Sequence, residues 1–281
     1  MTPDVMATPG YRGYSIVNYA CCFKGIVWRE TLRYWHQRER FLSALVRPLV
    51  WLFIFAAGFR SVLGVSIIPP YETYVLYEVY ITPGLMAMIA LFSGMQSSLS
   101  MVYDREMGNM RALLVSPFPR WFLLTSKLAA GTAVSLAQVY AFLIVAYFWE
   151  IEPPSLWGYL TVLPALVLAG LMLGALGMLL SSLIKQLENF AGIMNFIIFP
   201  MFFASSALYP LWRVRESSPW LAFVCELNPF THAVELIRFA FYERMNFPAL
   251  AIVLATTIGF LVAAIMAYDP SRGILSRREG P

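Results

Sequence analysis

The residues best suited to bind another molecule gather between positions 104 and 120. This stretch combines charged side chains with the flexible Gly108, an apolar pair at Leu113 and Leu114, and a stop at Pro117. Apolar and charged side chains on so short a segment favour a helix that is presented to a partner protein, and an ordinary loop between two helices is the alternative. We therefore interpret the stretch as a docking surface.

Groups that could catalyse a reaction or bind a metal are sparse. The histidines are His36 and His232, and the cysteines Cys21, Cys22 and Cys225 have neither zinc-site spacing nor the pattern of a disulfide framework. The sequence contains no Gly-x-x-x-x-Gly-Lys-[Ser/Thr] phosphate loop, so ATP hydrolysis would need another polypeptide. We expect neither a metal nor a cofactor in this chain.

The elements that position these residues are predicted to cross a membrane. The chain is 59% hydrophobic and 13% charged, whereas soluble domains carry roughly 25% charged residues. Its apolar residues come in blocks near the length of about 20 residues that crosses a bilayer. We predict an all-α protein with six transmembrane helices within a domain of residues 41–268, at about 41–63, 81–103, 126–149, 158–184, 189–208 and 247–268.

The segment before the first span, within a cytoplasmic region of residues 1–40, is predicted to be an amphipathic helix. Apolar residues recur at helical spacing between positions 15 and 40, while Arg29 and Arg33 share another face. Trp28 and the arginines suit a helix in the lipid headgroup layer. A solvated basic helix that merely precedes a span is the alternative.

The segment between positions 209 and 246 is too interrupted to span. Three prolines break it into short pieces, which favours a re-entrant or interfacial arrangement before the last helix. Glu235 and Arg238 are three residues apart and can pair on a helix. This pair either holds the segment in place or is an ordinary interfacial ion pair.

The basic residues predict the orientation. Most lysines and arginines fall in the two terminal segments, the tail at 269–281 included, and in the connections after the second and fourth spans. The positive-inside rule then places both termini in the cytoplasm. Arg47 is expected near the cytoplasmic end of the first span, where a long side chain can reach the lipid phosphates.

Two separated motifs resemble the ABC-2-type exporter permeases, the transmembrane subunits of ATP-binding-cassette exporters. The first follows the second span and consists of Glu106, Gly108, Leu113, Leu114, Ser116, Pro117 and Arg120. The second precedes the last span and consists of Tyr209 to Trp212, Asn228 to His232, Glu235 and Arg238. The resemblance covers nearly the whole chain.

The resemblance implies an ATP-driven exporter of a bacterial cytoplasmic (inner) membrane, with ATP and magnesium on a separate ATPase subunit. Two such permease subunits, in the simplest case a homodimer within a 2+2 complex, would form the pathway among membrane lipids, without nucleic acid. The amino-terminal helix and the loop after the second span would contact the ATPase. The implied coupling residues are Arg29, Arg33, Arg105, Glu106, Gly108, Leu113, Leu114 and Pro117.

The resemblance also places the second and fifth spans at the dimer axis. Candidate residues of the translocation path are Met86, Phe92 and Gln96 in the second span and Asn195, Phe196 and Phe199 in the fifth. Packing or lipid contact is the alternative role for these side chains. The candidate extracellular gate consists of Pro210, Asn228, Pro229, Phe230, Glu235 and Arg238.

Other classes of membrane protein fit less well. A secondary transporter or channel tends to have ionisable residues in mid-span, and the predicted span interiors contain almost none. A membrane-embedded enzyme would need a nucleophile, an acid–base pair or a metal set. A membrane anchor or assembly factor would need no docking signature. The cargo, whether drug, lipid, lipid-linked polysaccharide or another metabolite, is not specified by the sequence.

Overall fold

The structure is a computed structural model that describes residues 16–36, 38–59, 69–71, 75–106, 118–149, 151, 153–184 and 187–267. Every regular element in these ranges is a helix, so the all-α prediction is confirmed. The elements are α1 (Ile16–His36), α2 (Arg38–Phe59), α3 (Tyr77–Glu106), α5 (Arg120–Tyr147), α6 (Gly158–Leu183), α7 (Leu187–Phe203), α8 (Leu211–Ser217), α9 (Pro219–Leu227), α10 (Pro229–Phe241) and α11 (Phe247–Ala267). The expected tail at 269–281 lies outside the described residues.

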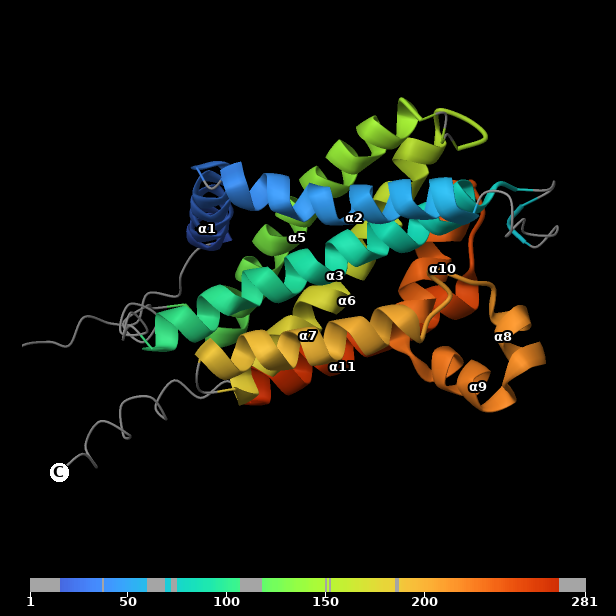
Figure 1. Ribbon diagram of the computed structural model, residues 1–281. Helices are drawn as coiled ribbons and strands as arrows, with labels where there is room; N and C mark the ends of the chain where they lie inside the picture. Colours follow the sequence, from blue (N-terminus) through green and yellow to red (C-terminus); the bar gives the residue numbers. More distant parts are fainter. Residues whose placement is uncertain are drawn as a thin grey trace, which may run out of the picture.

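The long helices form one bundle with α3 and α6 at its centre (Figure 1). Helix α6 packs against α3, α5, α10 and α11, and α3 also contacts α2, α5 and α7. In α3, 82% of the most apolar 18-residue window is buried, against 17% in α11. Helix α3 is therefore the core of the bundle, and α11 presents most of its surface to the surroundings.

Four helices are long and apolar enough to cross a membrane. They are α3 over Tyr77–Tyr103, α5, α6 and α11. Helices α2 and α7 contribute the shorter apolar stretches Leu45–Ile54 and Gly192–Phe203. The structure thus supports four of the six expected spans, and the count of six stays a prediction.

Two glycines let helices and turns approach α3 closely. A Cβ atom added at Gly94 would lie 2.9 Å from the backbone nitrogen of Gly174 in α6, and one added at Gly84 would lie 2.6 Å from the carbonyl oxygen of Ala207. Real Cβ atoms do not approach backbone atoms this closely. The absence of a side chain at these positions is what permits close packing of the kind common between helices in lipid.

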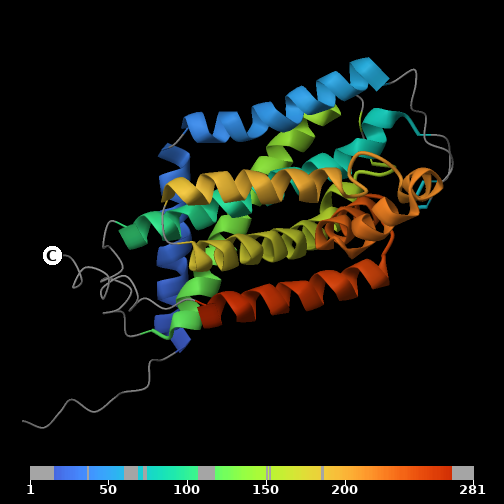
Figure 2. The same ribbon diagram turned by 60° about the horizontal axis from the view of Figure 1, so that its bottom comes forward.

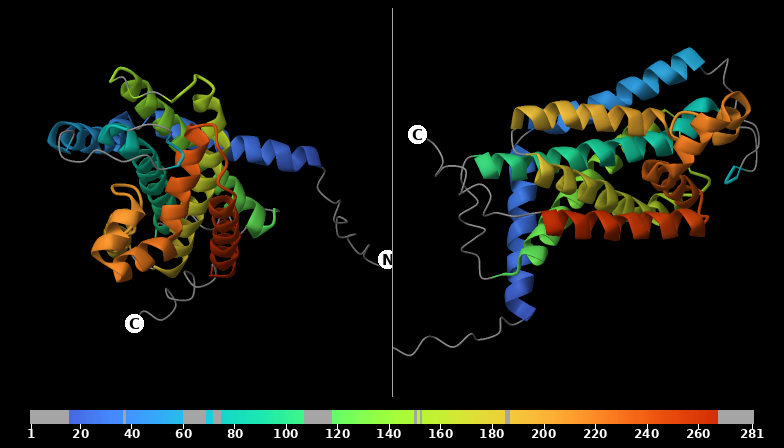
Figure 3. Two further views of the ribbon diagram at one scale, coloured as in Figure 1. Left: turned by 90° about the vertical axis from the view of Figure 1, so that its right-hand side faces the viewer. Right: turned by 90° about the horizontal axis from the view of Figure 1, so that it is seen from below.

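Helix α1 crosses one end of the bundle instead of running along it (Figures 2 and 3). At this end, which we call the α1 end, α3 finishes and α5 begins. The ring of Tyr19 lies edge-on to Phe118 and Phe122, with centroid distances of 5.1 and 4.9 Å. The expected amino-terminal helix is confirmed, and its contact with α5 fixes it across the bundle end.

The proline-rich segment forms α8, α9 and α10 at the opposite end (Figure 1). Each proline begins a helix: Pro210 is the N-cap of α8, and Pro219 and Pro229 occupy the first turns of α9 and α10. Proline suits these positions because the first N–H groups of a helix have no intrahelical partner. Helix α10 packs into the bundle against α3, α6 and α11.

Candidate functional site

Arg238 is the most strongly buried charge among the described residues of the candidate gate. Only 2% of this residue is exposed. Its guanidinium pairs with Glu235, donates a hydrogen bond to the carbonyl oxygen of Ser206 at 2.8 Å and lies 4.2 Å from the ring centroid of Tyr80. These partners offset the desolvation of the charge, which is severe when a buried guanidinium is unpaired.

The carboxylate beside it keeps Arg238 charged. Burial alone would lower the pKa of the guanidinium, but the attraction of Glu235, followed by the nearby phenol groups of Tyr80 and Tyr71, outweighs this effect and raises it overall. Glu235 and Arg238 therefore form an ion pair on one face of α10, as their spacing predicts.

Arg238 of this pair binds the turn after α7, at residues 204–208, which we call the post-α7 turn. Two tyrosines of α3 bind the same turn: the hydroxyl of Tyr77 donates to the carbonyl of Leu208 at 2.7 Å, and that of Tyr80 donates to the carbonyl of Ser206 at 3.1 Å. Buried backbone carbonyls that are not hydrogen-bonded within a helix need such donors. The core helix and α10 thus clamp this turn from two sides.

Asn228 connects the start of α10 to the end of α7. Its side-chain oxygen accepts a hydrogen bond from the N–H of Phe230 at 3.0 Å, which caps α10. Its Nδ2 atom donates to the carbonyls of Met201 and Ala204, both at 2.7 Å. One amide therefore satisfies a helix start and a helix end at once.

The residues after Asn228 secure α10 against α9. The hydroxyl of Thr231 donates to the carbonyl of Cys225 at 2.6 Å, and the Nε2 atom of His232 lies 2.9 Å from the carbonyl of Glu226. The structure thus brings five predicted gate residues into or beside α10, and Pro210 begins α8. Their role as a gate stays a prediction.

Sequence reasoning missed the acceptors and two donors of this arrangement. Tyr77 and Tyr80 are not among the predicted gate residues, because the second span is expected to begin at residue 81. Tyrosines at the end of an apolar segment are typical of the membrane interface, and this pattern could have pointed to the two donors. The carbonyl acceptors, such as that of Ser206, carry no side-chain signal.

The predicted path residues differ in exposure between α3 and α7. Met86 is completely buried inside the subunit and Phe92 is 7% exposed. In α7, Asn195 is exposed, and Phe196 and Phe199 are 79% and 40% exposed. The rings of Phe92 and Phe199 lie 6.5 Å apart, which brings the two predicted helices together at this point.

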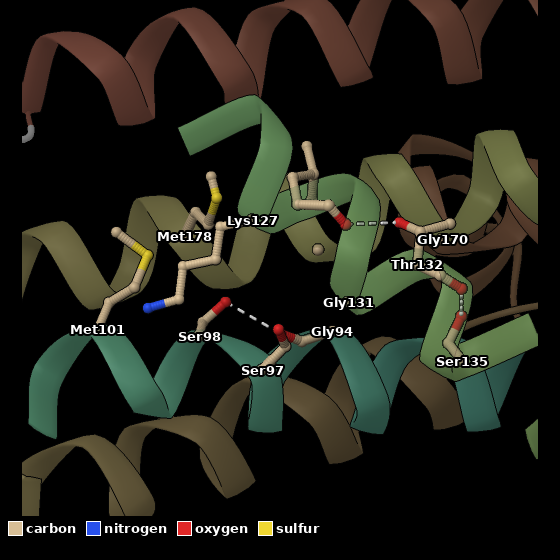
Figure 4. A pocket seen from close by; sticks show the side chains of 12 residues that line it. Gly94, Ser97, Ser98, Met101, Lys127, Gly131, Thr132, Ser135, Gly170 and Met178 are labelled. Carbon is tan, nitrogen blue, oxygen red and sulfur yellow. Dashed lines mark hydrogen bonds between the residues drawn. The ribbon is translucent and has the colours of Figure 1, made fainter. Parts of the chain in front are cut away.

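Gln96 is half-buried on α3, close to a small cavity between α3, α5 and α6. The cavity is lined mainly by glycines and hydroxyl side chains, and Figure 4 shows Lys127 directed toward Ser98. The hydroxyls of Ser98 and Thr132 bond to carbonyls of their own helices, at 2.9 and 3.0 Å. The cavity holds nothing larger than water, and it belongs to the packing seam of the bundle.

Most of the predicted coupling residues lie at or beyond the edge of the described chain. Gly108, Leu113, Leu114 and Pro117 fall outside the described residues, as do the side chains of Arg33, Arg105 and Glu106. The side chain of Arg29 is 62% exposed and pairs with Glu30 at 2.9 Å. Of the two flanks of the 107–117 segment, the start of α5 packs against α1, and the end of α3 lies at the same end of the bundle (Figure 2).

Comparison with known families and proteins gives one consistent result. A family model described as ABC-2 type transporter matches residues 22–242. A protein named as a transport permease in Porphyra purpurea is 25% identical over 272 residues, which cover 93% of this chain and 88% of that protein.

Two bacterial relatives give similar matches. A protein named as a multidrug ABC transporter permease in Escherichia coli K12 is 29% identical over 164 residues, 58% of this chain and 43% of that protein. Nodulation protein J of Sinorhizobium fredii is 25% identical over 258 residues, 90% of this chain and 92% of that protein.

Proposed function

Because this chain belongs to the ABC-2 type transporter family, we propose that it is the membrane-spanning subunit of an ATP-driven exporter whose ATPase is a separate polypeptide. The observation that carries the proposal is the family match over residues 22–242, on a helical bundle with four candidate spans. The sequence itself lacks a phosphate loop. ATP and magnesium would therefore be bound by the partner.

The α1 end is the proposed docking face for the ATPase. Helix α1 crosses this end, where α3 finishes and α5 begins, so that Arg29 and the two flanks of the 107–117 segment occupy the same end of the bundle. Helix α1 packs on α5 through Tyr19. A displacement of α1 by the ATPase would therefore be transmitted directly to α5, which is one of the long helices of the bundle.

Two copies of this chain, in a 2+2 complex with the ATPase, would enclose the pathway in a bacterial cytoplasmic membrane. If α2 and α7 cross the membrane together with the four longer helices, the chain has six spans. The distribution of basic residues then places both termini in the cytoplasm. Helices α8–α10 would then face outward as the extracellular segment. ATP binding would drive alternating access by moving the two membrane halves against each other.

Charge reversal at the end of α3 tests the docking face. Glu106→Lys should weaken the binding of the ATPase by about thirtyfold or more, and reduce the amount that co-purifies with the chain accordingly, because a lost interfacial charge pair costs about 2–5 kcal/mol. Glu216→Lys, at the exposed end of α8 on the other side of the bundle, is the matched control and should leave the yield of ATPase unchanged. Both variants should reach the membrane at wild-type amounts. Equal ATPase yields from the two variants would contradict the proposed docking face.

A further inference from the structure

Arg47 lies beside the middle of the core helix, not at a membrane surface. Its guanidinium carbon sits 3.9 Å from the ring centroid of Phe92. Phe92 is 15 residues from Tyr77 and 11 from Tyr103, so about 22 and 17 Å of helix separate it from the two ends of the candidate span. The sequence-based expectation that Arg47 reaches the lipid phosphates is therefore wrong for this conformation.

Aromatic rings continue from this contact along α2 and α7. Phe92 is followed by Phe199, and Phe199 stacks on Phe203 with centroids 6.3 Å apart. Phe203 in turn lies 5.9 Å from Trp51, one helical turn after Arg47 on α2. We call Trp51, Phe92, Phe199 and Phe203 the aromatic wall.

The charge on this wall needs a counter-charge. A basic side chain at membrane depth is costly unless it faces a partner or a cavity. Arg47 is exposed at the surface of the subunit, and within the described part of the chain no carboxylate forms an ion pair with it. Phe92 covers one side of the guanidinium through a cation–π contact and leaves its N–H donors for another group.

We propose that Arg47 and the aromatic wall bind the cargo, and that the cargo is an amphiphile with an anionic headgroup and an apolar body. This inference rests on the proposed exporter function. The guanidinium would bind the anionic group, and the exposed rings of Phe199 and Phe203 would contact the apolar part. The wall combines residues of α3 and α7, the helices that the family resemblance assigns to the path, with Trp51 of α2, and Arg47 lies one helical turn before Trp51.

Charge favours this occupant over a second copy of the chain. A two-fold interface places the same patch of both subunits face to face. Two Arg47 side chains would then approach each other in a medium of low dielectric constant, where like charges repel strongly. An anion between them would remove that repulsion.

The test uses the purified full chain in nanodiscs of zwitterionic phosphatidylcholine. The probes are 11-(dansylamino)undecanoic acid and its uncharged methyl ester, with binding measured by energy transfer from tryptophan and corrected with empty nanodiscs. Wild type should bind the acid about tenfold more tightly than the ester, as expected for a charge-assisted hydrogen bond. Arg47→Gln should abolish this preference without changing ester binding, and Arg47→Lys should retain most of it.

Two further variants give the experiment its controls. Arg215→Gln removes an exposed arginine of α8 and should keep the preference, whereas Phe199→Ala should weaken both probes alike. Equal binding of acid and ester by wild type, or an unchanged preference in Arg47→Gln, would overturn the proposal. A change in subunit association in Arg47→Gln with an unchanged acid preference would also overturn it and would assign the wall to a contact between copies. Because no ATPase takes part, the result is independent of the test of the exporter function.

Discussion

At the scale of single residues, the structure is held together at one end by polar side chains that bind backbone carbonyls. Arg238, Asn228, Tyr77 and Tyr80 all act in this way on the end of α7 and the post-α7 turn. A turn held by several independent donors has little freedom to move alone. We therefore expect the post-α7 turn and α10 to move together as one unit during transport.

Replacement of Arg238 should destabilise the protein strongly. Arg238→Ala leaves Glu235 without its partner and removes one of the two donors to the carbonyl of Ser206, and breaking a buried ion pair costs about 3–5 kcal/mol. Thermal unfolding in detergent, followed by tryptophan fluorescence, measures the loss. Arg215→Ala breaks an ion pair that is exposed on both sides and should change stability by less than about 1 kcal/mol. Equal effects of the two substitutions would show that the Arg238 cluster does not hold the fold.

Two substitutions of Asn228 should separate its two roles. Asn228→Ser keeps an oxygen that can cap α10 but loses the Nδ2 donor to the carbonyls of Met201 and Ala204, whereas Asn228→Ala loses both. The alanine variant should therefore unfold at the lower temperature, by an amount that corresponds to about 1 kcal/mol for the cap. If the two variants unfold at the same temperature, the cap contributes nothing measurable.

Of this residue-scale arrangement, the sequence could predict only the local part. The pairing of Glu235 with Arg238 follows from their spacing, and the start of α10 follows from Asn228 and Pro229. The bonds from Tyr77 and Tyr80 to the post-α7 turn join residues 131 and 126 positions apart, and no periodic pattern encodes them. The contact of Arg47 with Phe92 depends likewise on how α2 packs on α3.

At the scale of elements, the seam between α3 and α6 depends on backbones that approach closely. Gly94→Ala would place a Cβ atom against the backbone of Gly174, and overpacking of this kind costs about 1–3 kcal/mol. Gly259→Ala in α11 is the matched control, because no atom lies within 4 Å of the added methyl group. Thermal unfolding should show a lower midpoint for Gly94→Ala and an unchanged or higher one for Gly259→Ala. A tolerated Gly94→Ala would mean that the two helices can separate at little cost.

Element prediction succeeded where apolar length or proline was decisive. The apolar blocks predicted α6 and α11 to within one residue at each end, and α3 and α5 to within six, since each contains enough apolar side chain to cross a bilayer. The prolines mark the boundaries of α8–α10: the sequence predicts interruptions at these positions, and in the structure the prolines begin the helices. The fifth expected span, 189–208, extended beyond α7, because apolar composition does not distinguish a helix from the buried turn that follows Phe203.

At the scale of the whole molecule, the account requires the α1 end to face the cytoplasm. Cys21 is exposed on α1, whereas a cysteine placed at Glu216 would lie on α8 at the opposite end. In a background of Cys22→Ser and Cys225→Ser, a membrane-impermeant maleimide added to intact cells should label Glu216→Cys and spare Cys21 until the cells are opened. Labelling of Cys21 in intact cells would reverse the orientation and remove the proposed docking face from the compartment that contains ATP.

Helix α3, the core helix, connects the two ends of the molecule to which the account assigns a function. Helix α3 finishes at the proposed docking face, carries Phe92 at its middle and binds the post-α7 turn at its other end. It is also the most deeply buried of the four candidate spans. A displacement of α3 at the docking face would therefore be transmitted to the cargo surface and to α10 without an intermediate element.

The most direct test of the central claim is ATP hydrolysis by the chain with and without a partner. The protein purified alone should show no ATP hydrolysis above background, and the complex purified from its native membrane should contain a second polypeptide and hydrolyse ATP. Removing that polypeptide should abolish the activity, and adding it back should restore it. Appreciable hydrolysis by the chain alone, or a native complex without an ATPase, would contradict the account.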